Sequence, residues 1–161
     1  MDMRFIARSG LVAALYAALT LAPGLNSLAY GQVQFRVSEG LMPLATVDPA
    51  AVVGLTLGTA IANTASPMGL ADVLFGSLLT LVAALLMYRL GPRWLALAVP
   101  IVVNGLGVPV ELALVLQLPY GYSVLAVTAG EAAVMLTLGI IVLQVVRSGV
   151  LWPWGRTHPR G

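Results

Sequence analysis

The chain contains no cysteine and no lysine, and its single histidine, His158, lies in a polar C-terminal tail. Without cysteine there are no disulfides, no thiolate nucleophile and few routes to a zinc site. Without lysine there is no phosphate-binding Walker A motif, so any step driven by ATP must come from a partner. The motifs HExxH and GxSxG are also absent, which argues against a metalloprotease or a serine hydrolase. We therefore expect that the protein is not an enzyme and that it has no catalytic residues, metal or cofactor.

Charged residues are scarce as well. They make up 9% of the 161 residues, whereas 60% of the residues are apolar, and the mean hydropathy is +0.98. Such values are typical of integral membrane proteins and not of soluble domains. The composition predicts an all-α, multi-pass protein of the cell membrane.

Apolar runs separated by proline and glycine predict six helices in one compact bundle. The expected helices are Phe5–Ala22, Val33–Leu44, Ala50–Ser66, Ala71–Leu90, Trp94–Leu118 and Tyr120–Val146. Four of them approach or exceed the roughly 20 residues that cross a bilayer. The second is too short to span alone, so we expect other helices to shield it from lipid. Residues 1–150 should form this single transmembrane domain, followed by a short cytoplasmic tail at residues 151–161.

The arginines predict the orientation of the bundle. Seven of the eight lie at the start of the first helix, flank the turn after the fourth or follow the last. Six crossings put these places on one side, and the positive-inside rule makes that side the cytoplasm, with both termini inside. This topology accounts for the basic charge without nucleic-acid binding. As an alternative, Leu11–Ala22 could be the core of a cleavable signal, but its removal would spoil the charge asymmetry.

Four carboxylates fall within the predicted helices, accompanied by one arginine, Arg36: Glu39, Asp72, Glu111 and Glu131. An ionised acid near the bilayer centre costs on the order of 2.5–3.5 kcal/mol, so unpaired acids there usually meet a ligand, a proton or an ion. Four negative charges against one positive charge leave a formal charge of −3. This imbalance favours a cationic ligand that donates hydrogen bonds.

Each of these charges also has a simpler explanation. Arg36 and Glu39 are three residues apart and could pair with each other. Asp72 opens the fourth helix, where capping alone would account for it. Glu131 could be a satisfied structural carboxyl, and Glu111 and Glu131 together could form the proton relay of a proton-coupled transporter.

Small residues form two stripes at four-residue spacing on the first helix. Such stripes let helix backbones approach closely. They could serve packing within the bundle or docking onto another subunit. The first stripe holds Ser9, Ala13 and Ala17, and the second holds Gly10, Ala14 and Ala18.

The segment YGQVQFRVSEGL, Tyr30–Leu41, resembles the signature of the QueT family. Its members are the substrate-binding S components of energy-coupling-factor transporters for queuosine precursors. The segments ARSGLVAALYAALTLA, GTAIANTASPMGLADVLFGSLLTLVAALLMYRL and AGEAAVMLTLG are similar to the same family, so the resemblance covers nearly the whole chain.

The resemblance implies capture of 7-aminomethyl-7-deazaguanine or a close relative outside the cell. A transmembrane coupling subunit and two cytosolic ATPases would then drive transport of the ligand into the cell. The coupling subunit would contact the small-residue stripes of the first helix. Another cationic vitamin is an alternative ligand. The residues expected to bind the ligand are Tyr30, Gln34, Arg36, Glu39, Asn63, Asp72, Asn104, Glu111 and Glu131.

The chemistry of a deazaguanine suggests how these residues would divide the work. One carboxylate, from Glu131 or Glu39, can accept from the ring N–H and the exocyclic amino group together. The neighbouring carbonyl oxygen needs a donor, for which Gln34, Asn104 and Arg36 are candidates. The cationic arm needs a second acid, Glu111 or Asp72, and Tyr30 could stack on the ring.

Overall fold

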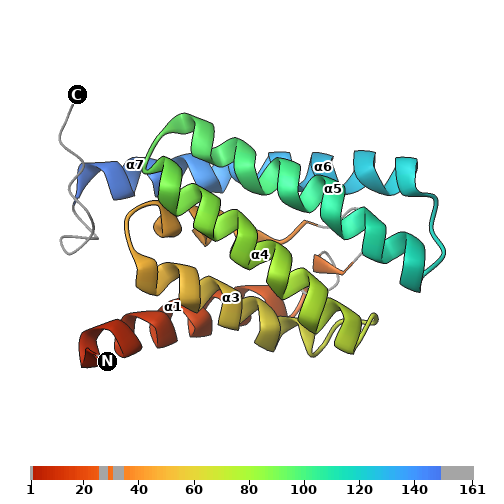
Figure 1. The fold of residues 1–161 in the computed structure, drawn as a ribbon, viewed down its shortest axis with the longest axis horizontal. Coiled ribbons are helices and arrows are strands. Elements are labelled where there is room, and N and C mark those ends of the chain that lie inside the picture. Colours follow the sequence, from red (N-terminus) through yellow and green to blue (C-terminus); the bar gives the residue numbers. More distant parts are fainter. Residues whose placement is uncertain (1, 26–28, 31–34, 150–161) are drawn as a thin grey trace.

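The computed structural model describes residues 2–25, 29–30 and 35–149, and every regular element within them is a helix. Six α-helices match predicted segments directly or in part, and three short 3-10 or π segments, labelled η, adjoin or separate them (Figure 1). The elements are α1 (Met3–Leu21), η1 (Val37–Thr46), α3 (Pro49–Asn63), α4 (Leu70–Leu90), η2 (Trp94–Leu97), α5 (Ala98–Val115), α6 (Tyr120–Val134), η3 (Met135–Gly139) and α7 (Ile140–Ser148).

The structure confirms the prediction of a helical membrane bundle. Four helical stretches are long and apolar enough to cross a bilayer: Met3–Leu21, Leu70–Leu90, Trp94–Val115 and Tyr120–Ser148. The last two correspond to the predicted fifth and sixth helices, each built from consecutive segments. Apolar side chains face outward, with Leu74 and Leu125 more than half exposed, whereas every acid of the described residues except Asp2 is buried. This inverted pattern suits a surface in contact with lipid.

The second predicted segment forms a 3-10 helix, η1, that begins at Val37 and contains Pro43. Proline has no backbone N–H and is poorly accommodated inside an α-helix, which fits the irregular geometry. At about 2 Å per residue, ten residues of 3-10 helix extend roughly 20 Å and cannot cross a hydrocarbon core of about 30 Å. Met42 and Ala45 are fully buried, so the surrounding helices shield η1 from lipid, as predicted.

The start of α1, the turn between α4 and η2 and the end of α7 lie at one end of the bundle (Figure 1). We call this the inner end and the opposite end the outer end. Arg147 stacks on Trp94 here, 5.4 Å from the ring centre, and Arg8 pairs with Asp48 at 3.0 Å. The inner segments carry Arg4, Arg8, Arg89, Arg93 and Arg147, whereas Arg156 and Arg160 lie outside the described residues. The positive-inside rule predicts that the inner end faces the cytoplasm.

The backbones of α1 and α3 are in close contact. A Cβ on Gly54 would lie 2.6 Å from the Ser9 carbonyl oxygen, and one on Gly58 would lie 2.9 Å from that of Ala13. Ser9, Ala13 and Ala17 are buried, so the first small-residue stripe serves packing inside the chain. The second stripe is exposed: Gly10, Ala14 and Ala18.

Candidate functional site

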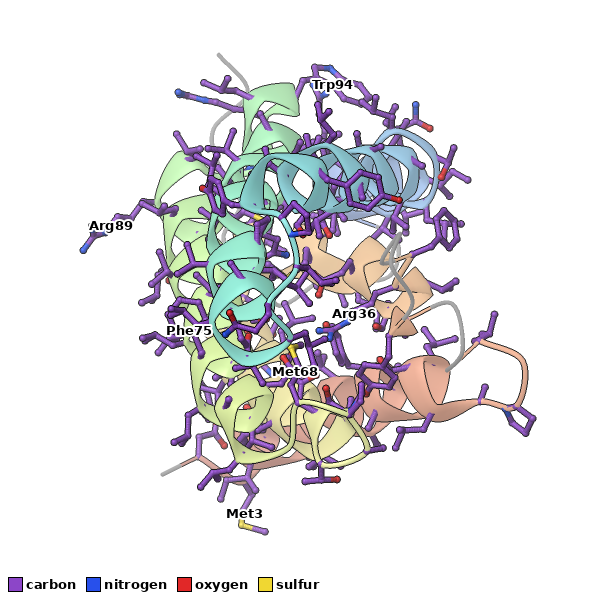
Figure 2. All side chains as sticks on the ribbon, turned by 90° about the vertical axis from the view of Figure 1, so that its right-hand side faces the viewer. Met3, Arg36, Met68, Phe75, Arg89 and Trp94 are labelled. Atoms are coloured by element: carbon purple, nitrogen blue, oxygen red, sulfur yellow. The ribbon has the colours of Figure 1, made fainter. Side chains whose placement is uncertain are left out.

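A polar layer near the outer end is organised around Arg36. Its guanidinium Nη2 lies 3.3 Å from Asp72 Oδ2, and its Nε donates to the Ala29 carbonyl at 3.2 Å. The Tyr30 ring lies beneath the guanidinium, 5.2 Å from ring centre to Cζ. Figure 2, which looks onto the outer end, shows Arg36 pointing between the helices while Arg89 points outward. Arg36 is therefore a buried structural and electrostatic centre, unlike the inner arginines.

Asp72 is fully engaged within this layer. Its Oδ2 meets Arg36, and its Oδ1 accepts from Asn63 Nδ2 at 2.9 Å. The same Asn63 nitrogen donates to the Asp72 carbonyl at 2.8 Å. Gly76 makes room for this cluster, because a Cβ there would lie 2.6 Å from Asn63 Nδ2. Both carboxylate oxygens of Asp72 thus already have a protein partner.

Two of the simpler explanations suggested by the sequence are wrong. Arg36 pairs with Asp72 and not with Glu39. Asp72 is not the cap of α4, because Gly69 occupies the cap position without a side-chain hydrogen bond and Asp72 lies in the first turn. A carboxylate there still interacts favourably with the helix dipole, but its main role is to hold Arg36.

A second polar layer lies deeper and contains Glu39 of η1. The Tyr16 hydroxyl of α1 donates to Glu39 Oε1, while Glu39 Oε2 has no hydrogen-bond partner among the described residues. Next to this contact, Thr20 and Ser38 share a hydrogen bond of 2.7 Å. Glu39 is only 2% exposed. One of its carboxylate oxygens is therefore held by α1 and the other is buried and free.

Glu39 and Glu131 line the same small cavity. The space is about 10 Å³, enough for about one water molecule. Asn104 and Glu131 both line this cavity, and Glu131 Oε1 has no hydrogen-bond partner among the described residues. The cavity is lined by Arg36, Glu39, Gly76, Thr80, Asn104, Val108, Val127 and Glu131.

Glu111 lies on α5, one helical turn beyond Val108 toward the outer end. It is 3% exposed, yet both of its carboxylate oxygens lack a partner among the described residues. Because the cavity residue Val108 lies one turn deeper on the same helix, Glu111 lies on the side of the cavity that faces the outer polar layer. An unsatisfied buried polar group costs about 1–3 kcal/mol, and more when charged. Several buried carboxylate oxygens in this arrangement therefore have no hydrogen-bond donor among the described residues.

The structure brings together most of the residues expected to bind a ligand. Four line the cavity, Arg36, Glu39, Asn104 and Glu131, and four belong to the adjoining outer layer, Tyr30, Asn63, Asp72 and Glu111. Gln34 lies outside the described residues.

Sequence reasoning missed Tyr16 and Thr80. Tyr16 could have been found from its position. Tyrosines of membrane proteins usually lie at the interface, whereas Tyr16 lies within the apolar part of the first helix. Thr80 gave none, because its hydroxyl bonds to the Gly76 carbonyl of its own helix.

Comparison with known proteins places the chain in a family. The model of a family described as QueT transporter matches residues 6–148, which include every site residue named above. The chain belongs to the QueT transporter family. This family is described as a family of transporters.

A curated member of this family also resembles the chain. The queuosine precursor transporter QueT of Lactococcus lactis subsp. cremoris is 44% identical over 72 residues, which cover 45% of this chain. The aligned region spans 42% of the length of that relative. No solved structure matches the chain.

Proposed function

We propose that this protein is the S component of an energy-coupling-factor importer and that it binds a queuosine precursor. The observation that carries the proposal is the buried acidic site, in which Glu39, Glu111 and Glu131 hold unpartnered oxygens. The ligand would be 7-aminomethyl-7-deazaguanine or a close relative. The relative from Lactococcus lactis carries the name of a queuosine precursor transporter, which supports the same ligand class.

The chemistry of the site suits such a ligand. Charge-assisted hydrogen bonds to carboxylates are roughly twice as strong as neutral ones, and they gain strength away from water. A cationic arm would offset part of the negative charge left by four acids and one arginine. A guanine-like ring supplies adjacent N–H donors for a carboxylate and a carbonyl oxygen for Arg36.

Ligand entry requires the site to open. The cavity of about 10 Å³ holds one water molecule, far less than a bicyclic base needs. Because the polar layers lie toward the outer end, we infer that the ligand enters from outside the cell.

Transport by this scheme needs partners. The chain has no lysine for nucleotide binding, so the proposal assigns ATP hydrolysis to two cytosolic ATPases. A transmembrane coupling subunit would contact the exposed stripe of α1, formed by Gly10, Ala14 and Ala18, where small side chains permit close helix approach.

A proton-coupled transporter is the second candidate, because Glu111 is buried without a partner and intramembrane acids can relay protons. Vesicles that contain this chain alone distinguish the two. Uptake driven by a pH gradient supports the proton-coupled transporter. Uptake that appears only with coupling subunit, ATPases and ATP supports the S component.

The identity of the ligand is tested by purifying the chain and analysing the bound small molecules by mass spectrometry. We expect a 7-deazaguanine to copurify. A variant in which Glu39 and Glu131 are both replaced by Gln is the matched control and should lose the compound. Recovery of an unrelated vitamin by the wild-type chain, or equal recovery by the control, would contradict the proposal.

A further inference from the structure

Helix α1 is bonded to an acid of the cavity without lining the cavity itself. The described residues that line it come from Arg36, η1, α4, α5 and α6, and none of them comes from α1. The Tyr16 hydroxyl of α1 nevertheless donates to Glu39 Oε1. The other oxygen of this carboxylate, Glu39 Oε2, is buried and has no partner among the described residues. The bond from α1 therefore determines which oxygen of Glu39 is left for another donor.

Packing fixes the ring of Tyr16. The side chain is fully buried, and it belongs to the apolar core together with Met42 of η1 and Leu55 of α3. A Cβ on Gly58 would lie 2.7 Å from Tyr16 Cβ, so α3 approaches the base of the ring as closely as a glycine allows. A tyrosine hydroxyl has a single hydrogen to donate. With the ring held in place, that hydrogen reaches one fixed point, the Oε1 atom of Glu39.

The glutamate, in contrast, has a long side chain that needs such a restraint. Immobilising one flexible side chain on binding lowers affinity by a factor of about two to ten. A hydrogen bond that already restrains Glu39 within the protein reduces this cost. The carboxylate then presents one oxygen in one direction, which is the preorganisation that a specific polar contact requires.

We propose that Tyr16 is a positioning residue of the ligand site, whose hydroxyl holds Glu39 Oε1 so that Oε2 is the oxygen that accepts from the ligand. The inference rests on the proposed function. It adds to the site a residue that lies outside the cavity and acts only through Glu39. Ligand affinity then depends on a hydroxyl that the ligand does not touch.

A second bond between α1 and η1 provides a matched control. The Thr20 hydroxyl donates to the Tyr16 carbonyl at 2.9 Å, which leaves the Ser38 hydroxyl to donate to Thr20 Oγ1 at 2.7 Å. Both hydroxyl groups are buried, and Ser38 directly precedes Glu39 in η1. Loss of the bond between Thr20 and Ser38 weakens the same helix contact but removes no contact of the acid.

The test measures binding of 7-aminomethyl-7-deazaguanine to the purified full chain by titration calorimetry. Tyr16→Phe keeps the ring and removes only the hydroxyl. It should weaken binding about two- to tenfold, the factor expected when the ligand has to immobilise the glutamate side chain. Thr20→Val should leave the affinity unchanged, although both variants lose one buried hydrogen bond between α1 and η1.

A double variant distinguishes positioning from a general loss of structure. In Glu39→Gln the amide oxygen accepts from the Tyr16 hydroxyl, so the amide nitrogen takes the place of Oε2 and presents a donor to the donors of the ligand. Without the hydroxyl, the amide can turn its oxygen toward the ligand. Tyr16→Phe combined with Glu39→Gln should therefore bind at least as tightly as Glu39→Gln alone, whereas independent structural effects would multiply.

The double variant also keeps the test valid if Tyr16→Phe alone is too unstable to purify, because it contains no carboxylate that has lost its donor. If the wild-type chain does not bind the base, the proposed function fails and the inference with it. Three results would overturn the role of Tyr16 alone: wild-type affinity in Tyr16→Phe, an equal loss in Thr20→Val, or losses that multiply in the double variant.

Discussion

The ion pair between Arg36 and Asp72 gives the sharpest prediction about stability. The two side chains approach to 3.3 Å, and the residues are 8% and 1% exposed. Removing one partner of a buried pair leaves an uncompensated charge and costs about 3–5 kcal/mol, whereas replacing both by neutral groups is often close to neutral. We therefore expect Arg36→Gln and Asp72→Asn each to be strongly destabilising and the double variant to recover most of the loss.

Thermal unfolding of the purified chain in detergent measures this effect. With roughly 2–4 °C per kcal/mol for a chain of this size, each single variant should lower the unfolding midpoint by about 6–20 °C. The double variant should unfold within a few degrees of the wild type. Single variants as stable as the wild type, or a double variant that loses the sum of both, would refute the assignment of this pair as a buried, mutually compensating unit.

Three further predictions concern α1. Gly54→Leu should lower the unfolding midpoint by several degrees, because its Cβ would lie 2.6 Å from a backbone oxygen of α1 and overpacking costs about 1–3 kcal/mol; Gly10→Ala, which meets no atom within 4 Å, should not. Ala14→Trp should abolish uptake in vesicles with all partners while the isolated chain still binds ligand, and normal uptake would exclude this face as the docking surface. Thr20→Val should cost about 1 kcal/mol in thermal unfolding by breaking the buried bond to Ser38, and an unchanged midpoint would show that the bond contributes nothing.

The sequence predicted the helices well, because proline, glycine and apolar length are local signals. Pro49 and Asp48 mark the start of α3 directly, with Asp48 capping the Ala50 N–H at 2.9 Å. The geometry of η1 was not predicted. Its 3-10 form depends on the helices that bury it as well as on Pro43, and the apolar pattern of ten residues does not distinguish these helix types.

The partners of the charges could not be predicted for a similar reason. Spacing along one helix suggested that Arg36 pairs with Glu39, but Arg36 meets Asp72, which is 36 residues away. The contact between Tyr16 and Glu39 likewise joins elements 23 residues apart. Such contacts depend on how the helices pack, and this packing cannot be read directly from a single sequence. The composition nevertheless predicted which residues would be buried together, since lipid forces polar groups inward.

If a flat, cationic base satisfies the acids in the membrane interior, the purified wild-type chain should bind 7-aminomethyl-7-deazaguanine in titration calorimetry. Binding should saturate at one ligand per chain and weaken at least tenfold when Glu131 is replaced by Gln. Absence of saturable binding, or an affinity that is the same with and without the Glu131 carboxylate, would show that such a base is not what the buried acids bind.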